Sequence, residues 1–162
     1  MLSVPVAFAC ASVGKAFYGE IASLGRKNGK DIYILTVRIM TKLFVISIVP
    51  FVLVICFGPW MFRTFFGVEW TESGIYARYL CLYLIFRFVY SPISDGIFNV
   101  FEQQKLVFRL EVSRIVIVAS SLLISYFYNF SVDTTIVIYS LALTVQYILS
   151  IIFVMYILRK VS

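Results

Sequence analysis

The feature that most constrains this chain is a series of apolar segments, each about as long as a membrane is thick. They cover residues 1–24, 42–62, 75–101, 112–128 and 134–158. A helix needs about 20 mostly apolar residues to cross a bilayer, and its backbone groups must be satisfied within the segment. The chain is 62% hydrophobic and 14% charged, whereas soluble domains are about 45–50% apolar and about 25% charged. The sequence therefore predicts an all-α membrane helix bundle of about five transmembrane helices in a single domain.

Basic residues gather at alternate connections between these segments. They are Arg26, Lys27, Lys30, Arg38 and Lys42 before the second segment, Lys105, Arg109 and Arg114 before the fourth, and Arg159 and Lys160 after the fifth. The positive-inside rule places these connections in the cytoplasm and residues 58–74 and 129–133 outside. From Asp31 we expect a short helix along the membrane surface before the second segment enters the bilayer. The prediction is a multi-pass membrane protein with a cytoplasmic C-terminus.

Composition also bears on the class of function. The chain has no histidine and three dispersed cysteines, so the commonest general base and metal ligand are missing from it. Its only paired acids in an outer loop, Glu69 and Glu72, suit the first turn of a helix. We expect no enzymatic activity, no cofactor and no metal. The net charge of +6 follows the membrane loops, so membrane lipids, and not nucleic acid, are the expected partners.

The third apolar segment carries a charge where lipid would not tolerate one. Arg87 lies twelve residues after Ile75, about 18 Å along a helix and near the middle of the bilayer. One face of this helix carries Tyr76, Leu80, Tyr83, Arg87, Tyr90, Ser91, Ser94 and Phe98. We interpret this face as the lining of a hydrated cavity, since a cation facing lipid costs several kcal/mol. The alternative is that Arg87 pairs with Asp95 or Glu102 for packing only.

Other polar or helix-breaking residues lie within the apolar segments. Lys15 is a candidate second cation of the cavity. Pro92 cannot donate to the carbonyl of Phe88, and Gly96 follows, so a hinge or a static bend is expected there. Gln146 in the last segment is expected to form a hydrogen bond between helices.

The run FGVEWTESGIYAR at residues 66–78 resembles a signature of bacterial polysaccharide flippases, FG-x-[EQ]-W-x-x-[AS]-G-x-Y-x-[RQ]. The preceding GPWMF at residues 58–62 is similar to the lead into this loop, with Met61 as a departure. SPIS at residues 91–94 and EQQ at residues 102–104 also resemble positions of that family. Its superfamily includes multidrug-and-toxin exporters and lipid-II flippases.

The resemblance implies the C-terminal part of a 12-helix protein, which would need a missing N-terminal half or a second copy to complete its cavity. It implies a place in the bacterial inner membrane and transport of undecaprenyl-diphosphate-linked oligosaccharide for polysaccharide, O-antigen or lipopolysaccharide biosynthesis. From position and chemistry, we expect Arg87 and Lys15 to bind the diphosphate. Hydroxyls expected to bind sugar are those of Tyr83, Tyr90, Ser91 and Ser94. The alternatives are a multidrug-type exporter of the same fold or a truncated product that transports nothing.

Overall fold

The computed structural model of the chain describes residues 3–25 and 28–161. It contains helices α1 (Ser3–Leu24), α2 (Gly29–Phe66), α3 (Thr71–Val100), α4 (Gln104–Phe127) and α5 (Val132–Val161), with a short 3-10 helix, η1 (Val68–Trp70), after α2. Every regular element in these ranges is helical, which confirms the all-α prediction. Three of the helices, α2, α3 and α5, are long and apolar enough to cross a membrane.

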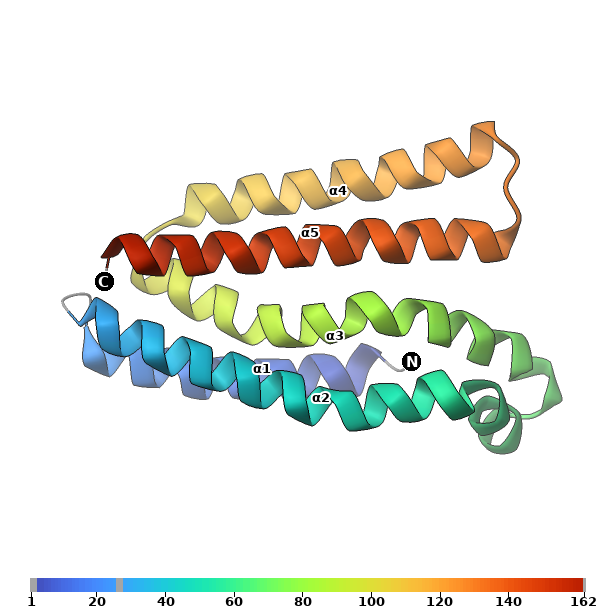
Figure 1. The fold of residues 1–162 in the computed structure, drawn as a ribbon, viewed down its shortest axis with the longest axis horizontal. Coiled ribbons are helices and arrows are strands. Elements are labelled where there is room, and N and C mark those ends of the chain that lie inside the picture. The colour runs from blue at the N-terminus through green and yellow to red at the C-terminus, as the bar shows by residue number, and fades with distance from the viewer. Residues whose placement is uncertain (1–2, 26–27, 162) are drawn as a thin grey trace.

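The helices run up and down alongside one another, as short connections require. α3 lies in the middle, with α1 and α2 on one side and α5 on the other, while α4 packs mainly on α5 (Figure 1). The α1–α2 turn, the α3–α4 turn and the C-terminal end of α5 lie at one end of the bundle (Figure 1). The basic connections thus share one end, except that Arg26 and Lys27 lie outside the described residues.

The core of the bundle follows the contacts of α3. Its buried hydrophobic side chains include Phe17 and Ile21 of α1, Ile32, Met40 and Leu43 of α2, Ile93, Ile97 and Phe98 of α3, and Leu143, Tyr147, Val154 and Leu158 of α5. Many large apolar side chains on the outer faces of α2, α4 and α5 are exposed instead. This distribution suits a bundle whose outer surface meets lipid.

The separate surface helix expected from Asp31 is not formed, because α2 is continuous for 38 residues from Gly29 to Phe66. A stripe of buried positions explains the continuity. It runs through Ile32, Thr36, Met40, Leu43, Ser47 and Phe51 at intervals of three or four residues, so one face of a single helix packs along its neighbours. At 1.5 Å per residue, α2 is about 57 Å long, well beyond the thickness of a hydrocarbon core.

Two glycines bring α2 and α3 unusually close at the far end of the bundle. A Cβ atom built on Gly74 would lie 2.6 Å from Cα of Pro59, and one on Gly58 would lie 2.9 Å from the Gly74 carbonyl oxygen. Small residues permit such close approaches in membrane helix pairs. Nearby, Nη2 of Arg78 donates a hydrogen bond to the carbonyl oxygen of Cys56 at 2.9 Å, which adds a polar link between the two helices.

Candidate substrate cavity

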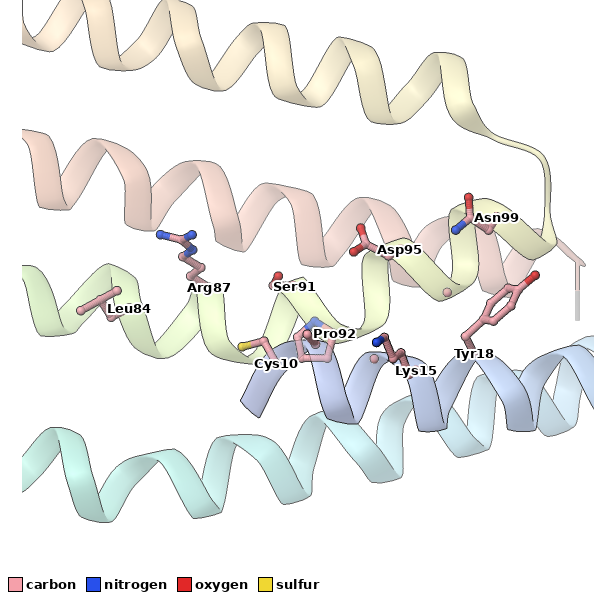
Figure 2. Close-up of a pocket in the computed structure, with 12 residues that line it drawn as sticks. Cys10, Lys15, Tyr18, Leu84, Arg87, Ser91, Pro92, Asp95 and Asn99 are labelled. Carbon is pink, nitrogen blue, oxygen red and sulfur yellow. The ribbon is translucent and has the colours of Figure 1, made fainter. Parts of the chain in front are cut away.

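A cavity of about 380 Å³ lies between α1 and α3. From α1 it is lined by Cys10, Ala11, Gly14, Lys15 and Tyr18, and from α3 by Leu84, Arg87, Ser91, Pro92, Asp95, Gly96 and Asn99. Figure 2 shows these side chains along the facing stretches of the two helices. Two cations, one carboxylate and several neutral hydrogen-bonding groups therefore share one space.

The close approach of α1 and α3 beside the cavity depends on Gly14 and Pro92. A Cβ atom on Gly14 would lie only 3.2 Å from the carbonyl oxygen of Pro92. Pro92 has no N–H, so the carbonyl of Phe88 lacks its usual helical donor. Sγ of Cys10 on α1 lies 4.0 Å from that oxygen, at the limit of a weak S–H hydrogen bond. The interruption in α3 is thus covered by α1.

Arg87 provides the positive charge nearest the middle of the 30-residue α3. It is exposed and, among the described residues, it makes no ion pair. The guanidinium is therefore available to a ligand, which disfavours the alternative that it serves only in a packing ion pair.

The structure brings together part of the predicted ligand set. Lys15, Arg87 and Ser91 line the cavity, together with the predicted hinge residues Pro92 and Gly96. Figure 2 shows Lys15 on α1 facing α3, and Arg87 and Ser91 one helical turn apart on α3. Lys15 and Arg87 come from different helices, so only their packing places both cations around one space.

The remaining predicted residues, Tyr83, Tyr90 and Ser94, do not line this cavity. Tyr83 stacks on Tyr147 of α5 with ring centroids 6.4 Å apart, and Tyr90 lies 5.8 Å from the same ring. Ser94 is buried, and its hydroxyl donates to the carbonyl oxygen of Ser91 at 3.1 Å. The two tyrosines therefore belong to the packing of α3 against α5.

Helix geometry explains this division. At about 100° per residue, Tyr83 and Tyr90 turn to one side of Arg87, whereas Ser91 and Asp95 turn to the other. The predicted polar face is wide enough to meet two neighbours, since α1 covers one of its sides and α5 the other. The sequence pattern identified this polar face, but it did not show which part would pack against α1 and which part against α5.

Pro92 and Gly96 have a packing role in this conformation. Both are buried, and α3 remains helical through them. A Cβ atom on Gly96 would lie 3.0 Å from Cδ1 of Phe17 and 3.2 Å from Cδ1 of Ile21. The glycine makes room for two core side chains of α1. The hinge stays a prediction.

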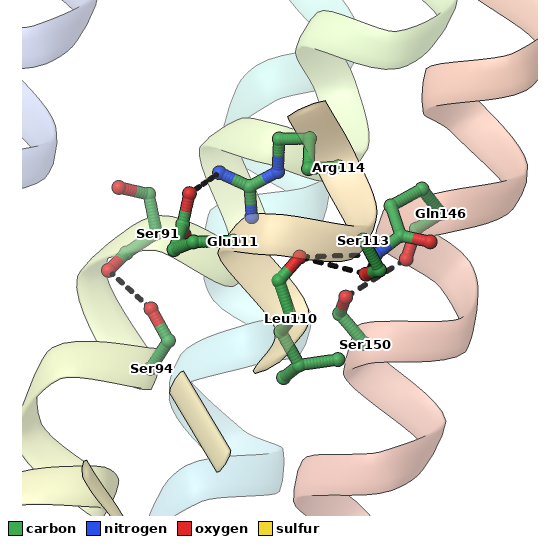
Figure 3. A network of polar contacts seen from close by, with 8 residues as sticks. All are labelled: Ser91, Ser94, Leu110, Glu111, Ser113, Arg114, Gln146 and Ser150. Carbon is green, nitrogen blue, oxygen red and sulfur yellow. Dashed lines mark hydrogen bonds and ion pairs between the residues drawn. The ribbon is translucent and has the colours of Figure 1, made fainter. Parts of the chain in front are cut away.

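Sequence reasoning missed a partly buried cation, because Arg114 was assigned to a cytoplasmic loop. It lies within α4, where Nη1 pairs with Oε2 of Glu111 at 2.9 Å and the guanidinium stands 4.7 Å from the centre of the Tyr147 ring. Its Nε and Nη2 are buried without a hydrogen-bond partner. Figure 3 shows this pair beside Ser91 and Ser94 of α3. The i, i+3 spacing of Glu111 and Arg114 was the available signal of a helix.

Gln146 forms the predicted hydrogen bond between helices. Its Nε2 donates to Oγ of Ser113 at 2.7 Å and to the carbonyl oxygen of Leu110 at 3.4 Å, which joins α5 to α4 (Figure 3). The residue is buried, so its amide is satisfied away from the cavity. Gln146 therefore positions α4 and is not a cavity ligand.

Comparisons with protein-family models, curated proteins and solved structures gave no match. Within the described residues, no group of three or more Cys, Asp or Glu side chains is arranged to hold a metal ion.

Proposed function

We propose that this chain is part of a membrane transporter that moves undecaprenyl-diphosphate-linked oligosaccharide between leaflets of the inner membrane. The observation that carries the proposal is a cavity between two apolar helices, with Arg87 and Lys15 on opposite walls. Arg87 makes no ion pair among the described residues. A planar guanidinium matches two phosphate oxygens at once, and an ammonium adds a second point of charge.

The neutral groups around these cations suit the sugar part of such a substrate. Ser91, Tyr18 and Asn99 supply hydroxyl and amide groups along the same space. Alternate donors and acceptors of this kind hydrogen-bond to sugar hydroxyls. In this proposal, the cavity of about 380 Å³ receives the diphosphate and an adjoining sugar. A longer oligosaccharide would extend into further walls supplied by a second bundle.

The test is complementation of a cell that lacks its own oligosaccharide flippase, scored by surface polysaccharide. Arg87→Ala is compared with the wild-type chain at equal membrane abundance, and Arg63→Ala, an exposed residue outside the cavity, is the matched control. We expect restoration by the wild type and by Arg63→Ala, and loss of at least about 10-fold with Arg87→Ala, the effect of removing a charge-assisted contact. Restoration by Arg87→Ala at the wild-type level would refute the role of Arg87.

A multidrug-type exporter is the second candidate, because Asp95 lines the same cavity. A carboxylate there would hold a cationic amphiphile. Asp95→Asn separates the two functions. The oligosaccharide proposal expects it to retain surface polysaccharide, whereas an exporter of cations would lose drug resistance with Asp95→Asn and keep it with Arg87→Ala.

A further inference from the structure

The outer face of α2 carries a shallow depression of about 430 Å³ near the Gly29 end of the helix. It is lined by Arg38, Thr41, Lys42, Val45 and Ile46. All five residues are exposed, and the two apolar ones expose 58% and 62% of their surface. The depression is separate from the cavity between α1 and α3, with which it shares no residue.

The packing of α2 explains why these residues face outward. Thr36, Met40 and Leu43 are buried on the opposite side of the same turns. They belong to the stripe that faces the rest of the bundle, so Arg38 and Lys42, four residues apart, lie together on the outer side. No helix in the described part of the chain covers that side, since all five lining residues are exposed.

The outer face carries two cations with exposed apolar residues on both sides along the helix axis, since Ile34, one turn before Arg38, is 55% exposed. The longer apolar run lies on the far side of Lys42. Arg38 and Lys42 are followed by Val45, Ile46 and then Val49, which is 65% exposed. Along the helix axis, the midpoint of Arg38 and Lys42 lies about 8 Å from the midpoint of Val45 and Ile46, at a rise of 1.5 Å per residue. The nearest acid on this face in the other direction, Asp31, is about 10 Å beyond Arg38. A phosphate group above the start of an acyl chain has the same order of charge and hydrocarbon.

We propose that this depression binds one anionic phospholipid of the leaflet at the Gly29 end of the bundle. Arg38 and Lys42 donate hydrogen bonds to the phosphate oxygens. The Thr41 hydroxyl lies beside them but donates to the carbonyl oxygen of Val37 at 2.9 Å. Val45 and Ile46 contact the first methylenes of an acyl chain. Free phosphate would gain nothing from the two apolar residues, so their place directly below the cations favours a lipid. The proposal is independent of any transport activity.

Native mass spectrometry of the full chain in detergent tests the site, with phosphatidylglycerol and phosphatidylcholine of identical acyl chains as probes. The variant is Arg38→Gln/Lys42→Gln. The control is Lys105→Gln/Arg109→Gln, which removes an exposed basic pair at the same spacing from α4. Each cation near an anionic lipid contributes roughly fivefold to binding, so the variant is expected to lose about 30-fold in affinity for phosphatidylglycerol. The control is expected to keep wild-type affinity.

A further arm distinguishes lipid from phosphate. We expect millimolar inorganic phosphate to leave the phosphatidylglycerol adduct in place, because it lacks the apolar contact. Helix content by circular dichroism establishes that the variant is folded. Equal loss in the variant and the control would mean diffuse surface charge and would overturn the site. Displacement of the lipid by phosphate, equal affinity for phosphatidylcholine, or unchanged binding by the variant would overturn it as well.

Discussion

Replacing Gly74 with alanine tests whether the close approach of α2 and α3 holds this end of the bundle together. The added Cβ would lie 2.6 Å from Cα of Pro59, 2.7 Å from its nitrogen and 2.8 Å from the carbonyl carbon of Gly58. All three are backbone atoms, and none can move by rotating a side chain. The two helices must therefore separate by roughly 1 Å to restore an ordinary van der Waals contact.

The cost can be estimated from packing. Overfilled contacts usually cost about 1–3 kcal/mol, and a rigid backbone on the opposing side favours the upper end. Alanine also gains about 1 kcal/mol over glycine inside a helix, so the net loss expected for Gly74→Ala is about 2 kcal/mol. Gly19→Ala in α1 is the matched control, because nothing lies within 4 Å of its new Cβ atom. It should gain about 1 kcal/mol, which leaves a difference of about 3 kcal/mol between the two variants.

The assay is reversible unfolding in mixed detergent micelles, followed by tryptophan fluorescence. The chain has two tryptophans, and both are close in sequence to this contact, since Trp60 follows Pro59 and Trp70 precedes α3. A difference of about 3 kcal/mol changes the folding equilibrium more than 100-fold. Equal stability of Gly74→Ala and Gly19→Ala would refute the reasoning, because it would mean that the helices do not approach as closely as the structure indicates.

Three further predictions concern the contacts of α4. Gln146→Leu and Ser113→Ala should each lower the free energy of unfolding by about 0.6–1.7 kcal/mol. The double variant should lose little more than either single variant, because both remove the same hydrogen bond. Fully additive losses in a double-mutant cycle would contradict this. Arg114→Met should change that free energy by less than about 1 kcal/mol, since it removes two buried N–H groups that lack partners and keeps the length of the side chain over Tyr147. Glu111→Ala should cost about 1 kcal/mol in the same unfolding assay, because it removes the one carboxylate paired with Arg114; a larger loss from Arg114→Met than from Glu111→Ala would show that the ion pair matters less than the stacking.

The helices themselves were largely predictable, because their signals are local. Long apolar runs separated by polar turns identified five segments, and the observed α3, Thr71–Val100, and α5, Val132–Val161, lie close to the predicted ranges. The exceptions were the starts of α2 and α4. At both starts, charged residues that the sequence analysis assigned to a loop or a surface segment form the first turns of the helix, which begins at Gly29 in α2 and at Gln104 in α4. A basic residue is compatible with a helix as well as with a loop, so charge is a poor guide to where a helix begins.

One residue of the candidate site and one contact between helices were also predictable from single residues. The depth of Arg87 in an apolar run indicated a polar surrounding, and the buried amide of Gln146 required a partner on another helix. In both examples the physical constraint is a property of one residue in an apolar environment. The structure provided the partner, Ser113, and a cavity beside Arg87.

The sequence by itself determined the helical class, the polar face of α3 and the presence of a cation near its middle, because apolar length, periodicity and the cost of a charge in hydrocarbon are local properties. Only the tertiary structure decided that Lys15 shares a cavity with Arg87, that Tyr83 packs on α5, and that Cys10 covers the carbonyl of Phe88. These contacts join positions far apart in the chain, 78 residues in the last example. They depend on which neighbour covers each side of α3, and helical periodicity carries no information about that choice.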